Sequence, residues 1–280
     1  MACDARFDVW TAGGIGNQLF QYAFGRALAA KSGVPVRYCY VATRFALLSE
    51  CFPHVKGSFQ SGDSSLKAVK TLSRPDEYMP GVLGLDPGLY FVGYWQNERY
   101  FADIADTLRQ ELALPRPSDL AARDSGLLSR IDGCSNPVMV SVRRGDDYAC
   151  RGWTLHRGYY FRAMDYMRER VPGCRFFVFS DDTKWCAETF RRCGDVEVVG
   201  CVTPVWWQLQ LMGKCRHAII SNSTFSWWGA WLGRANDGIV VAPKPWIRGD
   251  HGMGAIVCDR WVTLDADAPY DASKVPSGGA

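Results

Sequence analysis

A strand-like segment delivers two arginines and two aspartates to its carboxyl end. Within Pro137–Tyr148, the residues Arg143, Arg144, Asp146 and Asp147 directly follow an apolar, β-branched run. Ligands of open α/β sheets bind at the carboxyl ends of the strands. Arginine is permanently charged and forks two N–H donors onto phosphate oxygens, so it can hold a leaving diphosphate without a metal. The alternative is an ion-paired strand end in which Arg144 and Asp146 satisfy each other.

Polar residues also follow two later strand-like segments. Ser180, Asp181 and Asp182 stand between a predicted strand and a predicted helix. They can accept hydrogen bonds from a ribose or a base edge, although Asp182 is also placed to cap the helix. A second cluster offers donors at a helix N-terminus, which suits a diphosphate. It comprises Asn222, Ser223, Thr224, Phe225 and Ser226, followed by Trp227, Trp228 and Trp231 at a helical spacing that favours core packing over sugar stacking.

A glycine-rich turn separates the first predicted strand from the first predicted helix. Gly13–Gln18, with Gly14, Gly16 and Asn17, can bring backbone N–H groups close to an anionic group or another ligand. Leu19 replaces the third glycine of a dinucleotide-binding fingerprint, and no acidic residue closes the second strand. Nicotinamide binding is therefore weakly supported, and a tight structural turn is the alternative.

Composition limits the classes of partner and cofactor. The 280 residues carry 32 Lys and Arg against 29 Asp and Glu, and a net charge of +3 is too small for a nucleic-acid binder. The 11 cysteines form no Cys-x-x-Cys pair and the four histidines no metal-ligand pair, so we expect no metal and no other cofactor. Asp265-Ala-Asp267 matches a short signature of metal-dependent sugar transferases. Because it follows the last predicted strand, we interpret it as a chance match.

No residue pattern predicts a membrane span or a secretion signal. Acidic residues and no apolar run precede Gly13, and the uncharged stretch 218–233 is shorter than the roughly 20 residues that a spanning helix needs. We expect a cytoplasmic protein of bacterial or viral type, unless a membrane anchor has been removed. Its cysteines are then reduced and mostly buried.

Strand and helix patterns alternate in both halves of the chain. In the first half, predicted strands at 7–12 and 34–41 flank a helix at 17–31, and a helix follows at 99–114, while residues 50–90 show only weak periodicity. After a connector at 115–118, the predicted strands are 137–143, 175–180, 195–199, 218–221 and 238–242, and the helices are 158–171, 182–192, 204–215 and 224–233. This pattern predicts two doubly wound, Rossmann-like α/β domains with a cleft between them, at 1–130 and 131–265, followed by a flexible tail at 266–280.

Short motifs occur in a recognisable order along the chain. They are Gly13–Leu28, Gly93–Phe101, Val142–Asp146, Phe179–Trp185, Leu211–Met212 with Cys215, Ile220–Leu232 and Ala242–Trp246. In this order they resemble the motifs of the α-1,2-fucosyltransferase family, glycosyltransferase family 11. Val142–Asp146 is also similar to the arginine motif shared by α-1,2-, α-1,6- and protein O-fucosyltransferases.

The resemblance implies a GT-B architecture of two Rossmann-like domains. It further implies inverting, metal-independent transfer from GDP-β-L-fucose to the 2-hydroxyl of a galactose-terminated glycan. Arg143 and Arg144 would then hold the diphosphate, and residues 180–182 and 222–226 would line the nucleotide site. The glycine loop with Asn17 would face the donor across the cleft. The candidates for the acceptor side are Tyr94, Trp95, Gln96 and Asp147.

Two positions depart from the family pattern. The residue two before the first arginine is usually His and is Ser141 here, which puts the ligand contact of that His in doubt. Trp206–Gln208 stands where many members carry acidic residues before Leu-Met, so the acceptor or nucleotide contact can differ there.

Inverting transfer needs a base for the acceptor proton and stabilisation of the departing GDP. Asp146 is the candidate base, with Asp147 and Glu98 as rivals, and Arg143 is the candidate that stabilises the leaving group. Asp146 could instead position one of the arginines. Two other classes stay open: a catalytically silent nucleotide-sugar or glycan-binding protein, and an NADP-dependent oxidoreductase that uses Arg37 to bind a 2′-phosphate.

Overall fold

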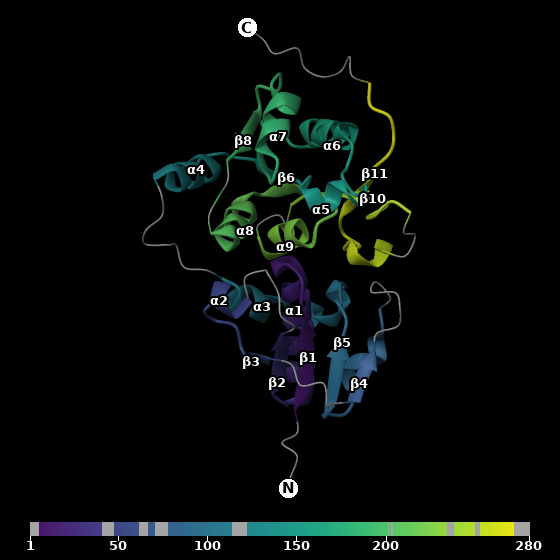
Figure 1. The fold of residues 1–280 in the computed structure, drawn as a ribbon. Coiled ribbons are helices and arrows are strands. Elements are labelled where there is room, and N and C mark those ends of the chain that lie inside the picture. The colour runs from purple at the N-terminus through teal and green to yellow at the C-terminus, as the bar shows by residue number, and fades with distance from the viewer. Residues whose placement is uncertain are drawn as a thin grey trace. The chain divides into compact units, whose positions relative to one another are not determined.

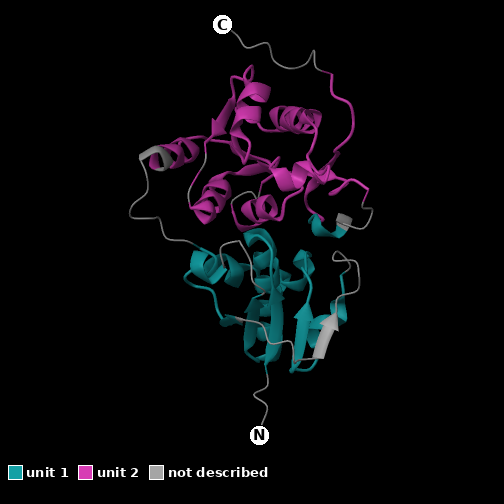
Figure 2. Cartoon of the chain, in the orientation of Figure 1, with its two compact units in different colours: residues 1–114, 252–258 teal, residues 115–251, 259–280 magenta. Residues whose placement is uncertain are grey.

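The chain forms two compact units, one of residues 1–114 with 252–258 and one of residues 115–251 with 259–280 (Figure 2). The computed structural model describes residues 6–40, 48–61, 67–70, 78–113, 122–200, 202, 204–233, 238–249 and 253–271. The units divide after residue 114, ahead of the expected boundary at 130, because helix α4 (Ala122–Asp132) belongs to the second unit and contacts α8 (Val205–Lys214). The predicted connector at 115–118 lies outside the described residues.

The first unit contains a five-stranded parallel sheet (Figure 1). Its strands are β1 (Phe7–Thr11), β2 (Val36–Tyr40), β3 (Ser58–Ser61), β4 (Lys67–Lys70) and β5 (Leu89–Val92), in the order β3-β2-β1-β5-β4. The predicted strand, helix and strand at its start are confirmed as β1, α1 (Ile15–Ser32) and β2. Gly33 ends α1 in the left-handed conformation, with φ 72°, that glycine adopts without strain.

Aromatic packing fixes β5 beside β1. Phe7 and Phe24 are fully buried, and their ring centroids lie 5.9 and 5.4 Å from that of Phe91 on β5. Because the strands are parallel, the chain leaves β1 and β5 at the same edge of the sheet. The glycine loop and the segment after β5 are thereby brought together.

Two parts of the first unit differ from the prediction. The helix predicted at 99–114 is divided into the 3₁₀ turns η2 (Glu98–Tyr100) and η3 (Ala102–Ile104) and the short helix α3 (Ala105–Glu111). Asn97 starts the first turn by accepting the Arg99 N–H at 3.0 Å, and buried Phe101 interrupts the helix with φ −131°. Residues 50–90 hold short elements whose length is too small for a clear period: the end of α2 (Leu48–Cys51), β3, β4, η1 (Pro80–Gly84) and β5.

The second unit contains a six-stranded parallel sheet in the order β11-β10-β9-β6-β7-β8. The strands are β6 (Pro137–Val142), β7 (Arg175–Ser180), β8 (Val196–Val199), β9 (His217–Ile219), β10 (Val240–Lys244) and β11 (Val262–Asp265). Besides α4 and α8, the helices are α5 (Asp146–Ala149), α6 (Arg157–Arg170), α7 (Thr183–Phe190) and α9 (Thr224–Leu232). The turn η5 (Met253–Ile256) precedes β11 in the chain and belongs to the first unit. The predicted alternation is confirmed, with β11 as an additional strand.

The core of the second unit confirms the prediction for the tryptophans. Trp227, Trp228 and Trp231 are at most 1% exposed, and their rings pack 5.0 to 5.8 Å apart. The described cysteines form no disulfide with one another, and most of them are buried. Within the described residues, no helix is both long and apolar enough to span a membrane.

The expected flexible tail is wrong for residues 266–271. Ala266 is buried, and the Tyr270 ring stacks on Phe161 of α6 with centroids 5.2 Å apart. The Tyr270 hydroxyl donates to Asp165 at 2.9 Å, and burial together with this hydrogen bond raises the pKa of Tyr270 to about 12. The packing arises because β11 continues the sheet beyond the last predicted strand. Residues 272–280 lie outside the described part of the chain.

The two carboxylates of Asp265-Ala-Asp267 serve the turn after β11. Asp265 accepts the N–H groups of Asp267 and Ala268 at 2.8 and 3.2 Å, and Asp267 pairs with Arg248 at 2.6 Å. These contacts are those of a structural turn.

A nearly buried ion pair holds α1 to α3 in the first unit. Glu111 accepts two hydrogen bonds from Arg26, at 2.7 and 2.8 Å, and one from the Tyr22 hydroxyl at 2.5 Å. Burial, with the hydrogen bond to Glu111, raises the pKa of Tyr22, which therefore remains a donor. Removing Glu111 would leave the charge of Arg26 without this partner.

We predict that Glu111→Ala lowers the free energy of unfolding by about 3 kcal/mol, because the remaining guanidinium is largely shielded from water. Urea denaturation followed by circular dichroism measures the change. Asp106→Ala is the matched control: it breaks the exposed pair with Arg109 and should cost about 0.5 kcal/mol or less. Equal losses in the two variants would contradict the prediction.

Candidate active site

The middle of the second sheet is where its polar loops gather. β6 pairs with β7 on one side and with β9 on the other, and all three strands are parallel. Their carboxyl ends carry residues 143–147 after β6, called the arginine loop below, residues 180–182 at the end of β7 and residues 221–226 after β9. The chain adds β7 and β8 on one side of β6 and then β9, β10 and β11 on its other side. Doubly wound sheets bind ligands at such a point, here between β6 and β9.

The Asp181 carboxylate organises the arginine loop. Its two oxygens accept the backbone N–H groups of Arg144 and Gly145, each at 2.8 Å. Oδ2 also lies 2.9 Å from Nη1 of Arg143. An alanine at 145 would bring its Cβ to 2.7 Å from this oxygen, so the close approach requires glycine. Asp181, expected from sequence at the nucleotide, therefore bonds directly to the loop.

The two arginines have different partners. Arg143 donates to both oxygens of Asp147, at 3.1 and 3.3 Å, and its Cζ lies 5.1 Å from the ring centroid of Tyr148. Arg144 lies beside Asp182, with 3.5 Å between Nε and Oδ2. The pairing of Arg144 with Asp146 that the sequence left open is not formed.

The Asp146 carboxylate is the exception in this loop. It is exposed at the first position of α5, and in the described part of the chain it makes no hydrogen bond or ion pair. Asp147, its rival as the base, is the residue that pairs with Arg143. Of the two neighbouring aspartates, only Asp146 thus has an unengaged carboxylate in the described structure.

Buried hydroxyls join β6, β9 and α9 beneath these loops. The Ser226 hydroxyl lies 2.5 Å from that of Ser141 and 3.1 Å from that of Ser221. All three side chains are at most 5% exposed. Ser141, where the family usually has His, therefore serves the interior. Ser226, expected to line the nucleotide site, is buried in the same chain of hydroxyls and does not reach the surface.

The start of α9 is tied to the arginine loop through Tyr148. The Tyr148 hydroxyl donates to the backbone oxygen of Asn222 at 3.0 Å, and burial raises the pKa of Tyr148, which keeps this donor protonated. The Asn222 amide donates to the backbone oxygen of Trp153 at 2.9 Å, and its own oxygen is buried without a hydrogen bond in the described structure. Ser223 is the N-cap but provides no side-chain cap. Thr224 and Phe225 are half-exposed.

Residues 180 and 182 have local roles at the start of α7. Asp182 accepts the Trp185 N–H at 2.9 Å, which confirms the capping role that the sequence offered as one alternative. The Ser180 hydroxyl accepts the Asp182 N–H at 2.9 Å.

In the first unit, the two predicted motifs meet at the carboxyl ends of β1 and β5. The Gln96 amide donates to the Asn17 side-chain oxygen at 3.0 Å. Gly13 has φ +81°, and a Cβ there would lie 2.8 Å from the Asn17 amide nitrogen, so this turn requires glycine. Gly14 caps α1, and Gly16 is buried in its first turn.

The acceptor-side expectation is wrong for one residue of this segment. Trp95 is 2% exposed and stacks on Phe24, with centroids 3.9 Å apart and ring planes 4° apart. Its φ of +55° is rare for a bulky residue and is held by this aromatic packing. Tyr94 is half-exposed, in edge contact with Trp10 at 5.5 Å.

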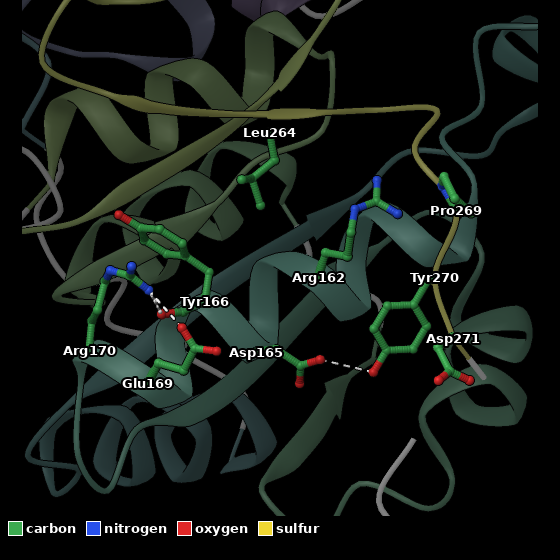
Figure 3. A pocket seen from close by; sticks show the side chains of 9 residues that line it. All are labelled: Arg162, Asp165, Tyr166, Glu169, Arg170, Leu264, Pro269, Tyr270 and Asp271. Carbon is green, nitrogen blue, oxygen red and sulfur yellow. Dashed lines mark hydrogen bonds and ion pairs between the residues drawn. The ribbon is translucent and has the colours of Figure 1, made fainter. Parts of the chain in front are cut away.

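A separate groove lies along α6, beside Leu264 of β11 and residues 269–271 (Figure 3). It is lined by Arg162, Asp165, Tyr166, Glu169, Arg170, Leu264, Pro269, Tyr270 and Asp271. None of the candidate site residues lines it, and two of its charged side chains, Arg170 and Glu169, pair with each other at 3.0 Å. Among the described residues, no cluster of three or more His, Cys, Asp or Glu side chains is placed to hold a metal ion.

Three residues of the site were not assigned a role from the sequence: Tyr148, Trp153 and Trp185. The position of Trp185, three residues after the N-cap Asp182 and just after the strand next to β6, was the sequence signal that could have predicted its contact with an arginine. Tyr148 and Trp153 contact the site through loop geometry that no sequence period reports.

The sequence model of Glycosyl transferase family 11 matches residues 80–265. The chain belongs to this family. An α-1,2-colitosyltransferase of Escherichia coli is 32% identical over 288 residues, covering 91% of this chain and 97% of the relative. Galactoside α-(1,2)-fucosyltransferase 1 of Mico humeralifer is 29% identical over 245 residues, covering 80% and 64%. Family membership supports glycosyl transfer as the activity.

Solved structures confirm the predicted GT-B fold. NodZ α-1,6-fucosyltransferase, soaked with GDP-fucose, superposes with a TM-score of 0.51 and 11% identity, covering 82% of this chain and 93% of NodZ. The Escherichia coli heptosyltransferase WaaC with ADP gives a TM-score of 0.50 and 9% identity, covering 93% of each chain. At these identities the likeness shows the fold alone.

We predict that Gly145→Ala lowers the free energy of unfolding of the second unit by about 1 to 2 kcal/mol, because the new Cβ displaces the Asp181 oxygen from its hydrogen bonds. Thermal unfolding measures it. Gly194→Ala, where a Cβ meets nothing within 4 Å, is the control and should change stability by about 0.5 kcal/mol or less. In an Asp181→Ala background the Gly145→Ala penalty should disappear, and an unchanged penalty would contradict the assignment to that carboxylate.

Proposed function

We propose that the chain transfers L-fucose from GDP-β-L-fucose to the 2-hydroxyl of a galactoside, with inversion and without a metal. One observation supports the proposal. The arginine loop, with its two arginines and the unengaged carboxylate of Asp146, lies at the carboxyl end of β6, where the strand order of the second sheet changes side. Tyr148 joins this loop to the start of α9. The names of two relatives, a colitosyltransferase and a fucosyltransferase, share the α-1,2 linkage.

In this proposal the acceptor oxygen forms a bond to C1 of fucose while the bond from C1 to the diphosphate oxygen breaks. The electron pair leaves with GDP, and the acceptor proton passes to Asp146. Arg143, Arg144 and the first N–H groups of α9 stabilise the charge that develops on the diphosphate. Asp146 is preferred to Asp147 as the base because the Asp147 carboxylate is already held by Arg143.

The local charge makes the start of α9 essential to this proposal. Asp146, Asp147, Asp181 and Asp182 lie among the two arginines, so the arginine loop does not form a basic patch. The backbone donors of α9 add positive potential without a counter-charge. We therefore assign Asn222, Ser223, Thr224 and Phe225 to the nucleotide. In the first unit, Gly14, Asn17, Tyr94 and Gln96 are the proposed substrate contacts.

A second donor is favoured by a specific observation. The α-1,2-colitosyltransferase relative spans almost the whole chain at 32% identity. Colitose is L-fucose without its 3-hydroxyl, so a site for one sugar differs from a site for the other by the partner of a single hydroxyl. GDP-colitose is therefore the alternative donor for the same reaction.

The test incubates the full chain with a β-galactoside and, separately, GDP-fucose, GDP-colitose, GDP-mannose or UDP-galactose, with and without EDTA. We expect GDP release only with both substrates present, with GDP-fucose preferred and EDTA without effect. Proton NMR of the product should show an α-anomer linked at O-2. Turnover with GDP-colitose alone selects the alternative donor, an EDTA-sensitive rate removes the metal-independent proposal, and GDP binding without turnover by any donor indicates a silent binding protein.

We predict that Asp146→Asn lowers kcat by about 10²- to 10⁴-fold, the range expected when a positioned base is lost. Its affinity for GDP should stay within about twofold of wild type, since the base acts on the acceptor proton. Steady-state kinetics and calorimetry measure the two quantities. Asp147→Asn is the control that keeps the proposed base: it should change the donor KM more than kcat, because it releases Arg143. The reverse pattern would assign the base to Asp147.

A further inference from the structure

The Arg144 guanidinium packs on the Trp185 ring and lies beside the Asp182 carboxylate. Its Cζ lies 4.1 Å from the ring centroid of Trp185, within the range of a cation–π contact. Nε is buried and lies 3.5 Å from Asp182, too far for a hydrogen bond. Within the described residues, the Arg144 guanidinium donates no hydrogen bond at all, whereas that of Arg143 is engaged by two carboxylates. The stacking contact therefore sets the plane of Arg144.

Trp185 is itself well fixed. Its backbone N–H donates to the Asp182 carboxylate in the first turn of α7. The other oxygen of the same carboxylate lies beside Nε of Arg144, so Asp182 orients both the start of the helix and the arginine. The indole makes edge contacts with buried Tyr160 and Phe190, at centroid distances of 6.4 and 6.2 Å. A ring anchored in this way against the core can hold a long, flexible arginine in one orientation.

We propose that Trp185 is a positioning residue for the donor: it holds Arg144 so that the guanidinium N–H groups meet the diphosphate already oriented. This rests on the proposed function, in which Arg144 binds GDP. The gain comes from pre-organisation, because an arginine that is already ordered loses less conformational freedom on binding. Trp185 acts through Arg144 and does not touch the substrate.

The experiment titrates GDP into the full chain by calorimetry in four variants: Trp185→Leu, Trp185→Phe, Arg144→Ala and the double variant Trp185→Leu/Arg144→Ala. We expect Trp185→Leu to weaken GDP binding about tenfold and Trp185→Phe, which keeps an aromatic face, by less than about threefold. In the Arg144→Ala background, Trp185→Leu should change affinity by less than about twofold. In kinetics, Trp185→Leu should raise the donor KM and also lower kcat, because Arg144 stabilises the charge on the leaving diphosphate, while the acceptor KM stays near wild type.

Tyr166→Leu is the matched control, because it removes a similarly close contact, between the Tyr166 ring and Arg170 Cζ at 3.8 Å, in the groove along α6. It should leave GDP binding unchanged. The proposal is overturned if Trp185→Leu has no effect, or if it weakens binding by the same factor with and without Arg144. Should Trp185→Leu fail to fold, Arg144→Lys tests the contact from the other side: it should weaken binding, and adding Trp185→Phe should not weaken it further. Wild-type protein that does not bind GDP overturns the proposed function and this inference together, whereas wild-type binding with unaffected variants overturns only the inference.

Discussion

Each sheet places its first strand in the interior, and the candidate sites depend on this constraint. β6 lies between β7 and β9, and β1 lies between β2 and β5. Parallel strands are joined by crossover connections, so the chain can add strands on one side of the first strand and then cross to its other side. Loops distant in sequence therefore end beside each other. Ser141 contacts Ser226 across 85 positions, and Gln96 contacts Asn17 across 79.

At the carboxyl end of β6, carboxylates and aromatic rings of neighbouring elements hold the arginine loop in its conformation. Asp181 holds the backbone of the loop, and Tyr148 ties it to α9. Below it, the hydroxyls of Ser141, Ser221 and Ser226 satisfy one another in the interior. A loop secured from several directions reorganises little when a substrate charge develops, which is the condition for effective electrostatic catalysis.

The features predicted from sequence are those that local patterns encode. Apolar strands of five or six residues, the long helix α1 and the glycine loop were all recognisable, and so were the polar strand ends. The sequence did not predict which carboxylate pairs with each arginine. The spacing of Arg144 and Asp146 gives no information about Asp182, which follows a different strand and is the residue beside Arg144. Trp95 was misassigned for a similar reason: its left-handed backbone turns it into the core, against the surface role that its motif suggests. The strands β3, β4, β5 and β11 were not predicted, because each is short and shows only two repeats of the two-residue strand period.

The pairing of Arg143 has a consequence for selectivity among small ions. An anion that approaches this guanidinium competes with Asp147 and Asp181, two carboxylates tethered within the same site. A tethered competitor acts at an effective concentration on the order of millimolar or higher, so a weakly bound monovalent ion such as chloride gains little by displacing it. A nucleoside diphosphate bound as proposed would contact both Arg143 and the start of α9, and these several contacts together would offset the loss of the ion pairs. If the arginine loop binds GDP as proposed, its acidic residues exclude common small anions from a position that two unpaired arginines would leave open to them.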